Sequence, residues 1–135
     1  MVRAWRHRAD DGAERGSAVV DFVLVSALAI AVTLAVSQVA LYLYERNVLM
    51  GSLSEGARVA AAEGHTVAEG QQRAVTLVRA SVGAQVAGAV TITGATDGTR
   101  VVLSATGGLP SFVPLVPSLP AHLTASMHKE ERLVP

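Results

Sequence analysis

The sequence of 135 residues contains no cysteine, few aromatic residues and few charges, which make up 16% of the chain. Without cysteine there is no disulfide framework, and a structural zinc site is improbable. The formal net charge is zero, so the chain does not carry the basic surface typical of nucleic-acid binding. This length accommodates one small domain and one membrane segment but not a large catalytic domain.

Catalytic and cofactor-binding motifs are also missing. The four histidines do not form an H-E-x-x-H pattern or another close metal-binding spacing; they are His7, His65, His122 and His128. Ser52 and Ser54 lie between two glycines but do not form a G-x-S-x-G motif. The Gly107-Gly108 pair lacks the following lysine of a phosphate-binding loop. We therefore predict a protein that is not an enzyme and has no metal, cofactor, nucleic-acid partner or small-molecule substrate.

One long apolar run dominates the N-terminal third of the chain. No residue from Phe22 to Leu43 is charged, and 22 helical residues extend about 33 Å, enough for a bilayer core of roughly 30 Å. Four arginines precede the run: Arg3, Arg6, Arg8 and Arg15. The positive-inside rule then places the N-terminus in the cytoplasm and the later residues outside, with Tyr42 and Tyr44 in the outer aromatic belt.

Two ordinary explanations of this run leave features unexplained. A secretory signal peptide has a shorter apolar core, and here the run continues past the small-residue cleavage motifs around Ala29. An uncleaved signal anchor explains the length and the orientation. It leaves Asp21 as a bystander, although a carboxylate at membrane depth costs about 2.5 to 3.5 kcal/mol on insertion scales.

A third explanation uses these features together. The stretch "ERGSAVVDFVLVSALAI" resembles the class III prepilin signal of the tight-adherence (Tad/Flp, type IVb) pilus system. The resemblance implies that a prepilin peptidase cuts after Gly16 on the cytoplasmic side, so that Ser17 begins the mature chain and Phe22 is its sixth residue. Asp21 is then the fifth mature residue, where the family usually has glutamate.

The resemblance continues beyond the apolar run. The stretch "LYLYERNVLMGSLSEGARVAAAEG" is similar to TadE-like minor pilins or pseudopilins, with Asn47, Glu55 and Arg58 in matching positions. It implies a non-catalytic subunit that assembles or initiates the Flp pilus. The implied partners are the prepilin peptidase, other pilus subunits, the inner-membrane assembly platform and the membrane itself. The implied location is the cytoplasmic membrane, as a single-pass protein, or a pilus on the cell surface.

These resemblances suggest roles for individual residues. In a bundle of apolar helices, the Asp21 carboxylate can neutralise the new amine of Ser17 or of a neighbouring subunit. Asn47, Glu55 and Arg58 are candidate contacts with other subunits. Glu55 and Arg58 also have the spacing of a solvated ion pair on one helix, which is an equally good explanation for those two.

The remaining sequence predicts two helices. The first continues to near Glu63, with an apolar stripe that includes Leu49 and Leu53, and Glu45 on the surface. Gly51 and Gly56 weaken this helix and could kink it. A capping box that starts at Thr66 opens a second helix, which is expected to end at about Val82.

Three strands are expected after the helices. From Gln85 the apolar residues alternate, and Asp97-Gly98 supplies a hairpin turn. Residues 107–120 contain four of the five prolines and predict an irregular loop, followed by a third strand that includes Leu123. The expected fold is α+β and pilin-like, with an extended N-terminal helix. The expected divisions are a cleavable leader (1–16), a transmembrane helix (17–44) and an extracytoplasmic domain (45–135).

Overall fold

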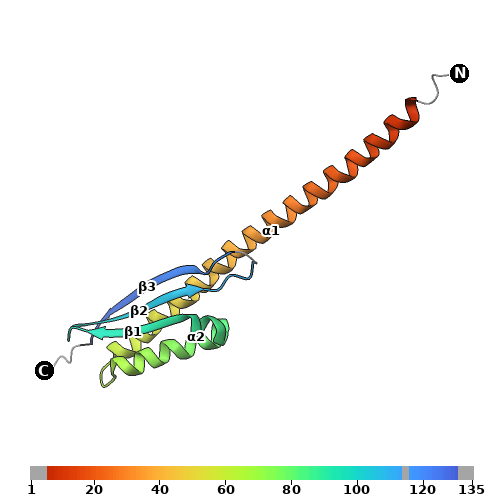
Figure 1. Ribbon diagram of the computed structural model, residues 1–135. Helices are drawn as coiled ribbons and strands as arrows, with labels where there is room; N and C mark the ends of the chain where they lie inside the picture. The colour runs from red at the N-terminus through yellow and green to blue at the C-terminus, as the bar shows by residue number, and fades with distance from the viewer. Residues whose placement is uncertain (1–5, 114–115, 131–135) are drawn as a thin grey trace. The chain divides into compact units, whose positions relative to one another are not determined.

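The computed structural model describes residues 6–113 and 116–130, with the backbone alone for residues 6–15. Two helices are followed by three strands (Figure 1), and the chain divides into two compact units, Met1–Ser37 and Gln38–Pro135. The second unit contains the last part of the first helix, the second helix and the whole sheet. The α+β class and the long N-terminal apolar helix predicted from the sequence are confirmed.

Helix α1 (Arg6–Ala61) is longer at its start than the sequence indicated, because the residues before Ser17 are also helical. It ends two residues before Glu63, ahead of a turn in which Gly64 has φ 80°. The helix passes through Gly51 and Gly56 without interruption. The helix therefore does not break at either glycine, although each costs about 1 kcal/mol of helix propensity relative to alanine.

Helix α2 (Val67–Ala89) begins with the predicted capping box. The Thr66 amide donates to Glu69 Oε2 over 2.7 Å, and the Glu69 amide donates to Thr66 Oγ1 over 3.3 Å. Gly83 (φ 85°) breaks the helix one residue after its expected end, but the chain then resumes helical structure up to Ala89. The strand expected from Gln85 is thus wrong for residues 85–89, where Val86 packs in the core as part of a helix.

The sheet contains β1 (Val90–Thr96), β2 (Arg100–Leu109) and β3 (Leu119–His128), paired antiparallel in the order β1-β2-β3. The β1–β2 turn is the one predicted from Asp97-Gly98. Asp97 Oδ1 accepts hydrogen bonds from the amides of Thr99 and Arg100 over 2.9 and 2.7 Å, and Gly98 has φ 94°. These hydrogen bonds to the ionised form lower the pKa of Asp97.

The connection between β2 and β3 is shorter than the irregular loop expected at residues 107–120. Gly107 and Gly108 belong to β2, and β3 already includes Pro120. A side chain at Gly107 would overlap the carbonyl oxygen of Ala89, so this glycine allows the end of α2 and β2 to approach closely. Pro120 is tolerated because β3 is an edge strand and pairs only with β2.

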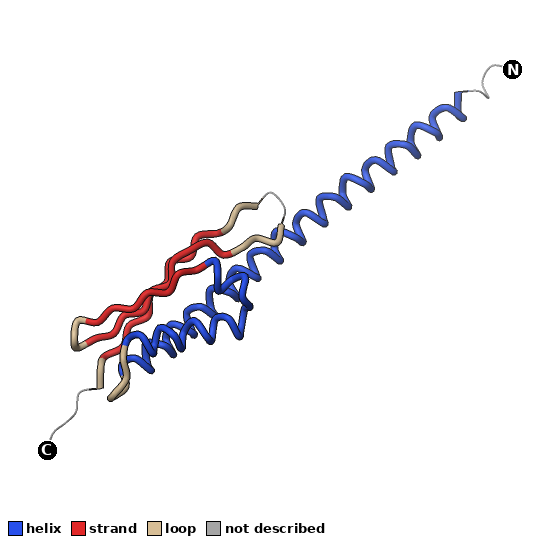
Figure 2. Tube along the Cα trace, turned by 60° about the horizontal axis from the view of Figure 1, so that its bottom comes forward, coloured by secondary structure: helices blue, strands red, loops and turns tan. Residues whose placement is uncertain are grey.

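The core lies between one face of the sheet and a layer formed by α2 and residues 38–61 of α1 (Figure 2). Fully buried side chains come from both layers: Leu49, Leu53, Val78, Val101 and Leu103. Alternate residues of β3 point away from the helices, and His122 and His128 are exposed there. The helical stripe predicted around Leu49 and Leu53 is therefore the core-facing side of α1.

Candidate membrane helix and assembly surface

Residues 16–37 of α1, called the exposed segment below, present apolar side chains on every side of the helix. Large side chains that remain exposed include Val19, Phe22, Leu24, Leu28 and Ile30. Among the residues that the structure describes, α1 is the one helix long and apolar enough to cross a membrane, and its most apolar stretch has no buried residue. A helix that is apolar on all sides needs surroundings other than water. This single N-terminal helix indicates membrane anchoring.

The predicted processing residues lie at the beginning of the exposed segment. Gly16 is exposed, and no atom lies within 4 Å of where a side chain would start. Ser17 and Asp21 are one helical turn apart, so they share a face of the helix. Phe22 is 72% exposed. Within the described residues no hydrogen bond or ion pair involves the Asp21 side chain, which leaves its carboxylate available to another chain.

Residues 38–61 of α1, called the packed segment below, have one buried and one outward face. Asn47 and Arg58 are eleven residues apart, about three turns, and therefore point in nearly the same direction. Both are exposed, and Gly51 lies between them with open space around it. We call Asn47, Gly51 and Arg58 the outward stripe. Two of the three predicted subunit contacts thus lie on one surface.

Glu55 and Arg58 form the ion pair that their spacing predicts. Arg58 Nε donates to Glu55 Oε2 and Arg58 Nη2 to Glu55 Oε1, each over 2.9 Å. The hydrogen bond from Arg58 lowers the pKa of Glu55, and Glu55 in turn raises the pKa of Arg58. The arginine remains 66% exposed, so a further partner can reach it.

Gly56 lies between these two residues in the sequence. The structure shows why this position has no side chain. A side chain at Gly56 would come within 2.5 Å of the Gly70 carbonyl oxygen and 2.8 Å of Ala74 Cβ. A side chain at Gly70 would overlap the Gly56 carbonyl oxygen in return. The E-G-A-R motif therefore combines a close crossing of α1 and α2, which also buries Ala57, with an ion pair on the outside.

Three polar residues at the start of the packed segment were missed by sequence reasoning. Gln38 and Glu45 are buried, and the Tyr42 hydroxyl donates to the Pro120 carbonyl over 3.1 Å. Gln38 Oε1 accepts from Ser111 Oγ and from the Phe112 amide, both over 3.2 Å. The sequence did contain a signal that these residues face the core. Gln38, Tyr42 and Glu45 continue the stripe of Leu49 and Leu53 at steps of three or four residues.

Glu45, expected on the surface, instead lines a cleft of about 270 Å³ beside Leu41, Val82 and Phe112. The residue is only 6% exposed, and loss of hydration raises the pKa of its carboxyl group. Among the described residues, the lining of this cleft holds no histidine and no second carboxylate, and its Ser111 hydroxyl donates to Gln38.

Comparison with known proteins identifies the first part of the chain. Residues 16–58 match the family model described as TadE-like protein. Over these residues, about a third of the chain, the sequence is similar to that family. No curated protein and no solved structure matches it significantly. The TadE-like family is structural and associated with the Tad pilus.

The TadE-like match extends over both segments of α1. It begins at Gly16 and ends at Arg58, and therefore includes Asp21, Asn47 and Glu55. The last three residues of α1, helix α2 and the sheet lie after it. The matched part is thus the helix with the apolar run and the outward stripe, while the rest of the domain is what that helix packs against.

Proposed function

We propose that the protein is a non-catalytic minor pilin or pseudopilin that serves as a structural or assembly subunit of a tight-adherence type IV pilus or a related secretion machine. A prepilin peptidase removes the leader after Gly16. The observation that carries this proposal is the TadE-like match, which begins at Gly16 itself and includes the apolar helix and the acidic residue at mature position five.

The proposed membrane segment begins at the new N-terminus. Residues 17–37 are 21 helical residues of about 1.5 Å each, close to 31 Å, which suits a hydrocarbon core of roughly 30 Å. From Gln38 onward α1 belongs to the second compact unit. We therefore place the outer end of the span near Gln38, within the 17–44 range expected from the sequence, and the second unit outside the cytoplasm.

The proposed role of Asp21 is charge pairing during assembly. After cleavage the Ser17 amine is a new positive charge one helical turn from Asp21. A negative side chain near a helix N-terminus is also favourable to the helix dipole. In an assembly of apolar helices a paired carboxylate is tolerated, whereas an unpaired one is costly, so Asp21 selects the register of neighbouring subunits.

The outward stripe is the proposed surface for other subunits outside the membrane. Asn47 and Arg58 flank Gly51, where the absence of a side chain lets another helix approach closely. The ion pair with Glu55 orients the guanidinium of Arg58, a member of this stripe, without burying it. The assembly platform and other pilus subunits are the expected partners.

The first experiment is the N-terminal sequence and intact mass of the full chain, expressed with and without its cognate prepilin peptidase. We expect a peptidase-dependent loss of residues 1–16 that leaves Ser17 first. A Gly16→Val variant, which keeps the helix but blocks the processing site, should stay intact in both conditions. An intact N-terminus with an active peptidase would leave an uncleaved signal-anchored protein with a partner-binding outer domain, and would exclude the pilin assignment.

The assembly role of Asp21 has a matched set of variants. Asp21→Glu introduces the residue usual in the family and should assemble, whereas Asp21→Asn should be cleaved normally but be lost from sheared pili. Protein level and cleavage in the membrane fraction serve as controls. Normal incorporation of Asp21→Asn would show that the carboxylate is only tolerated near the interface.

A further inference from the structure

The described residues of the connection between β2 and β3, 110–113 and 116–118, are called the β2–β3 loop here. It lies in a stretch, residues 101–128, that contains no Asp, Glu, Lys or Arg. Phe112 is 47% exposed and Val116 is 39% exposed. Outside helix α1, these two and Met127 are the large apolar side chains that remain exposed in the described part of the chain. The loop thus combines absence of charge with an uncovered apolar surface.

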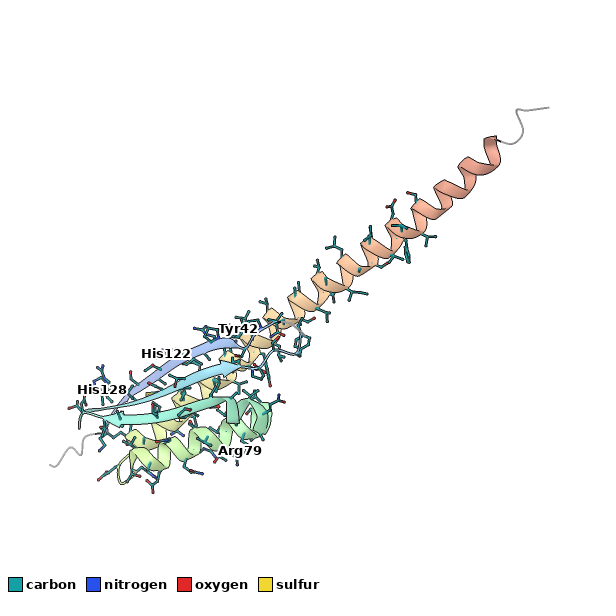
Figure 3. All side chains as sticks on the ribbon, viewed as in Figure 1. Tyr42, Arg79, His122 and His128 are labelled. Carbon is teal, nitrogen blue, oxygen red and sulfur yellow. The ribbon has the colours of Figure 1, made fainter. Side chains whose placement is uncertain are left out.

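The start of the β2–β3 loop and the first residues of β3, which follow the loop, are fastened to the same turn of α1. At the first end, Gln38 Oε1 accepts hydrogen bonds from the Ser111 hydroxyl and the Phe112 amide, both over 3.2 Å. Just beyond the other end, in β3, the Tyr42 hydroxyl donates to the Pro120 carbonyl oxygen over 3.1 Å. Figure 3 shows Tyr42 on α1 beside this end of the sheet. These contacts fix the loop at the beginning of the packed segment.

That turn of α1 follows directly on the proposed membrane segment. Gln38 is the residue after Ser37, at which the exposed segment ends. If Ser17 lies at the inner boundary, a rise of about 1.5 Å per residue places Gln38 at the outer boundary of the hydrocarbon core. Moving exposed apolar side chains at this level from water into the lipid interface lowers the free energy.

We propose that the β2–β3 loop is a membrane-docking loop, with Phe112 and Val116 inserted in the interfacial layer of the lipid leaflet beside the outer end of the span. This inference rests on the proposed membrane insertion of residues 17–37. Residues 101–128 include no Asp, Glu, Lys or Arg, so this stretch itself contributes no such ionised side chain that would have to be moved out of water. The loop gives the outer domain a second, peripheral contact with the bilayer.

Tryptophan fluorescence in liposomes tests the proposal on the full chain. The one natural tryptophan, Trp5, is replaced by phenylalanine, and single tryptophans are then introduced. The probe is Phe112→Trp, with Val116→Trp as a second probe in case the first variant does not fold. Each protein is reconstituted in phosphatidylcholine–phosphatidylglycerol vesicles, with or without acyl chains brominated near the headgroup in both leaflets.

Two further variants are matched controls. Met127→Trp replaces a side chain that is 37% exposed on β3, at a position paired with Val101 near the β1–β2 turn. Phe22→Trp reports on the membrane segment itself. We expect brominated lipid to reduce the emission of the Phe112 and Phe22 probes, with a blue shift at both, and to leave the Met127 probe unchanged.

The outcomes separate this inference from the proposed function. Quenching at position 22 without quenching at positions 112 and 116 would keep the membrane segment but overturn the docking loop. Absence of quenching at position 22 would overturn membrane insertion, and the inference with it. A blue shift at position 112 without quenching would mean that a protein neighbour covers the loop, which also contradicts the proposal.

Discussion

In residues 16–37 of α1 large apolar side chains are exposed on every side, whereas in residues 38–61 the buried ones lie on one face, against α2 and the sheet. The exposed segment has no buried side chain in its most apolar stretch. The packed segment buries polar residues as well, among them Gln38 and Glu45. The two segments of this helix therefore differ in what surrounds their side chains. The packed segment is covered by other residues of the chain, whereas the exposed segment is not.

The largest expected effect comes from truncating leucine in each segment. Leu53→Ala should lower the free energy of unfolding of the outer domain by about 2–5 kcal/mol, because the side chain is fully buried and leaves a cavity. Leu28→Ala should leave it unchanged, since Leu28 is 65% exposed. The measurement is urea unfolding of the full chain in mild detergent, followed by pulse proteolysis. Equal effects would contradict the division of α1 into two segments.

Replacing each of two glycines of the packed segment by alanine should change the stability of the domain in opposite directions. Gly56→Ala should destabilise the domain by about 1–3 kcal/mol, because its methyl group would meet Gly70 and Ala74. Gly51→Ala should stabilise it by about 1 kcal/mol, because alanine favours the helix and meets no neighbour. If the outward stripe contacts another helix, Gly51→Ala will also reduce incorporation into pili. A stabilised variant that assembles normally would argue against this contact.

A smaller effect should mark the boundary between the two segments. Gln38→Leu removes the acceptor for the Ser111 hydroxyl and the Phe112 amide and should cost about 1 kcal/mol. Ser37→Leu, one residue earlier, removes only a bond from Ser37 to the Thr33 carbonyl within the helix and should leave domain stability unchanged. The same urea titration measures both. A loss in Ser37→Leu as large as in Gln38→Leu would place the boundary earlier in α1.

The smallest effect concerns pH. Burial raises the pKa of Glu45 above its ordinary value of 4.5. The carboxyl group of Glu45 therefore binds its proton more tightly in the folded state than in the unfolded state. Its contribution to stability falls as the pH rises from the ordinary value through the raised pKa. Glu55, Glu69 and Asp97 have lowered pKa values and stabilise the fold above their ordinary values, a contribution lost as the pH falls through the folded-state pKa. Relative to the unmodified chain, Glu45→Gln should gain stability between acidic and neutral pH. A difference independent of pH would mean that Glu45 is hydrated.

Signals confined to a few neighbouring residues predicted their structures well. The Thr66–Glu69 capping box and the Asp97-Gly98 turn were both confirmed, because each is built from hydrogen bonds between residues at most three positions apart. The stripe of Leu49 and Leu53 correctly identified the buried face of the packed segment. Of the candidate site, the Glu55–Arg58 pair was anticipated in the same way.

Features that depend on distant residues were not predictable in this way. Residues 85–89 alternate like a strand, yet they pack as a helix over the sheet. The two-glycine stretch at Gly107 looks like a loop, but pairing with β1 and close contact with Ala89 keep it in β2. Glu45 continues the stripe of Leu49 and Leu53, but this spacing alone does not show that a carboxylate is removed from water, which only the residues around its cleft do.

The sequence by itself determined the run of membrane length, the cap, the turn and the α+β class, because local propensity and hydrophobic period act over a few residues. The tertiary structure decided that Gln38 and Glu45 are covered together with the leucine stripe and why Gly56 and Gly70 must lack side chains. It also decided that the β2–β3 loop is held at Gln38. The physical reason is that these features arise from contacts between residues far apart in the chain, which no local pattern encodes.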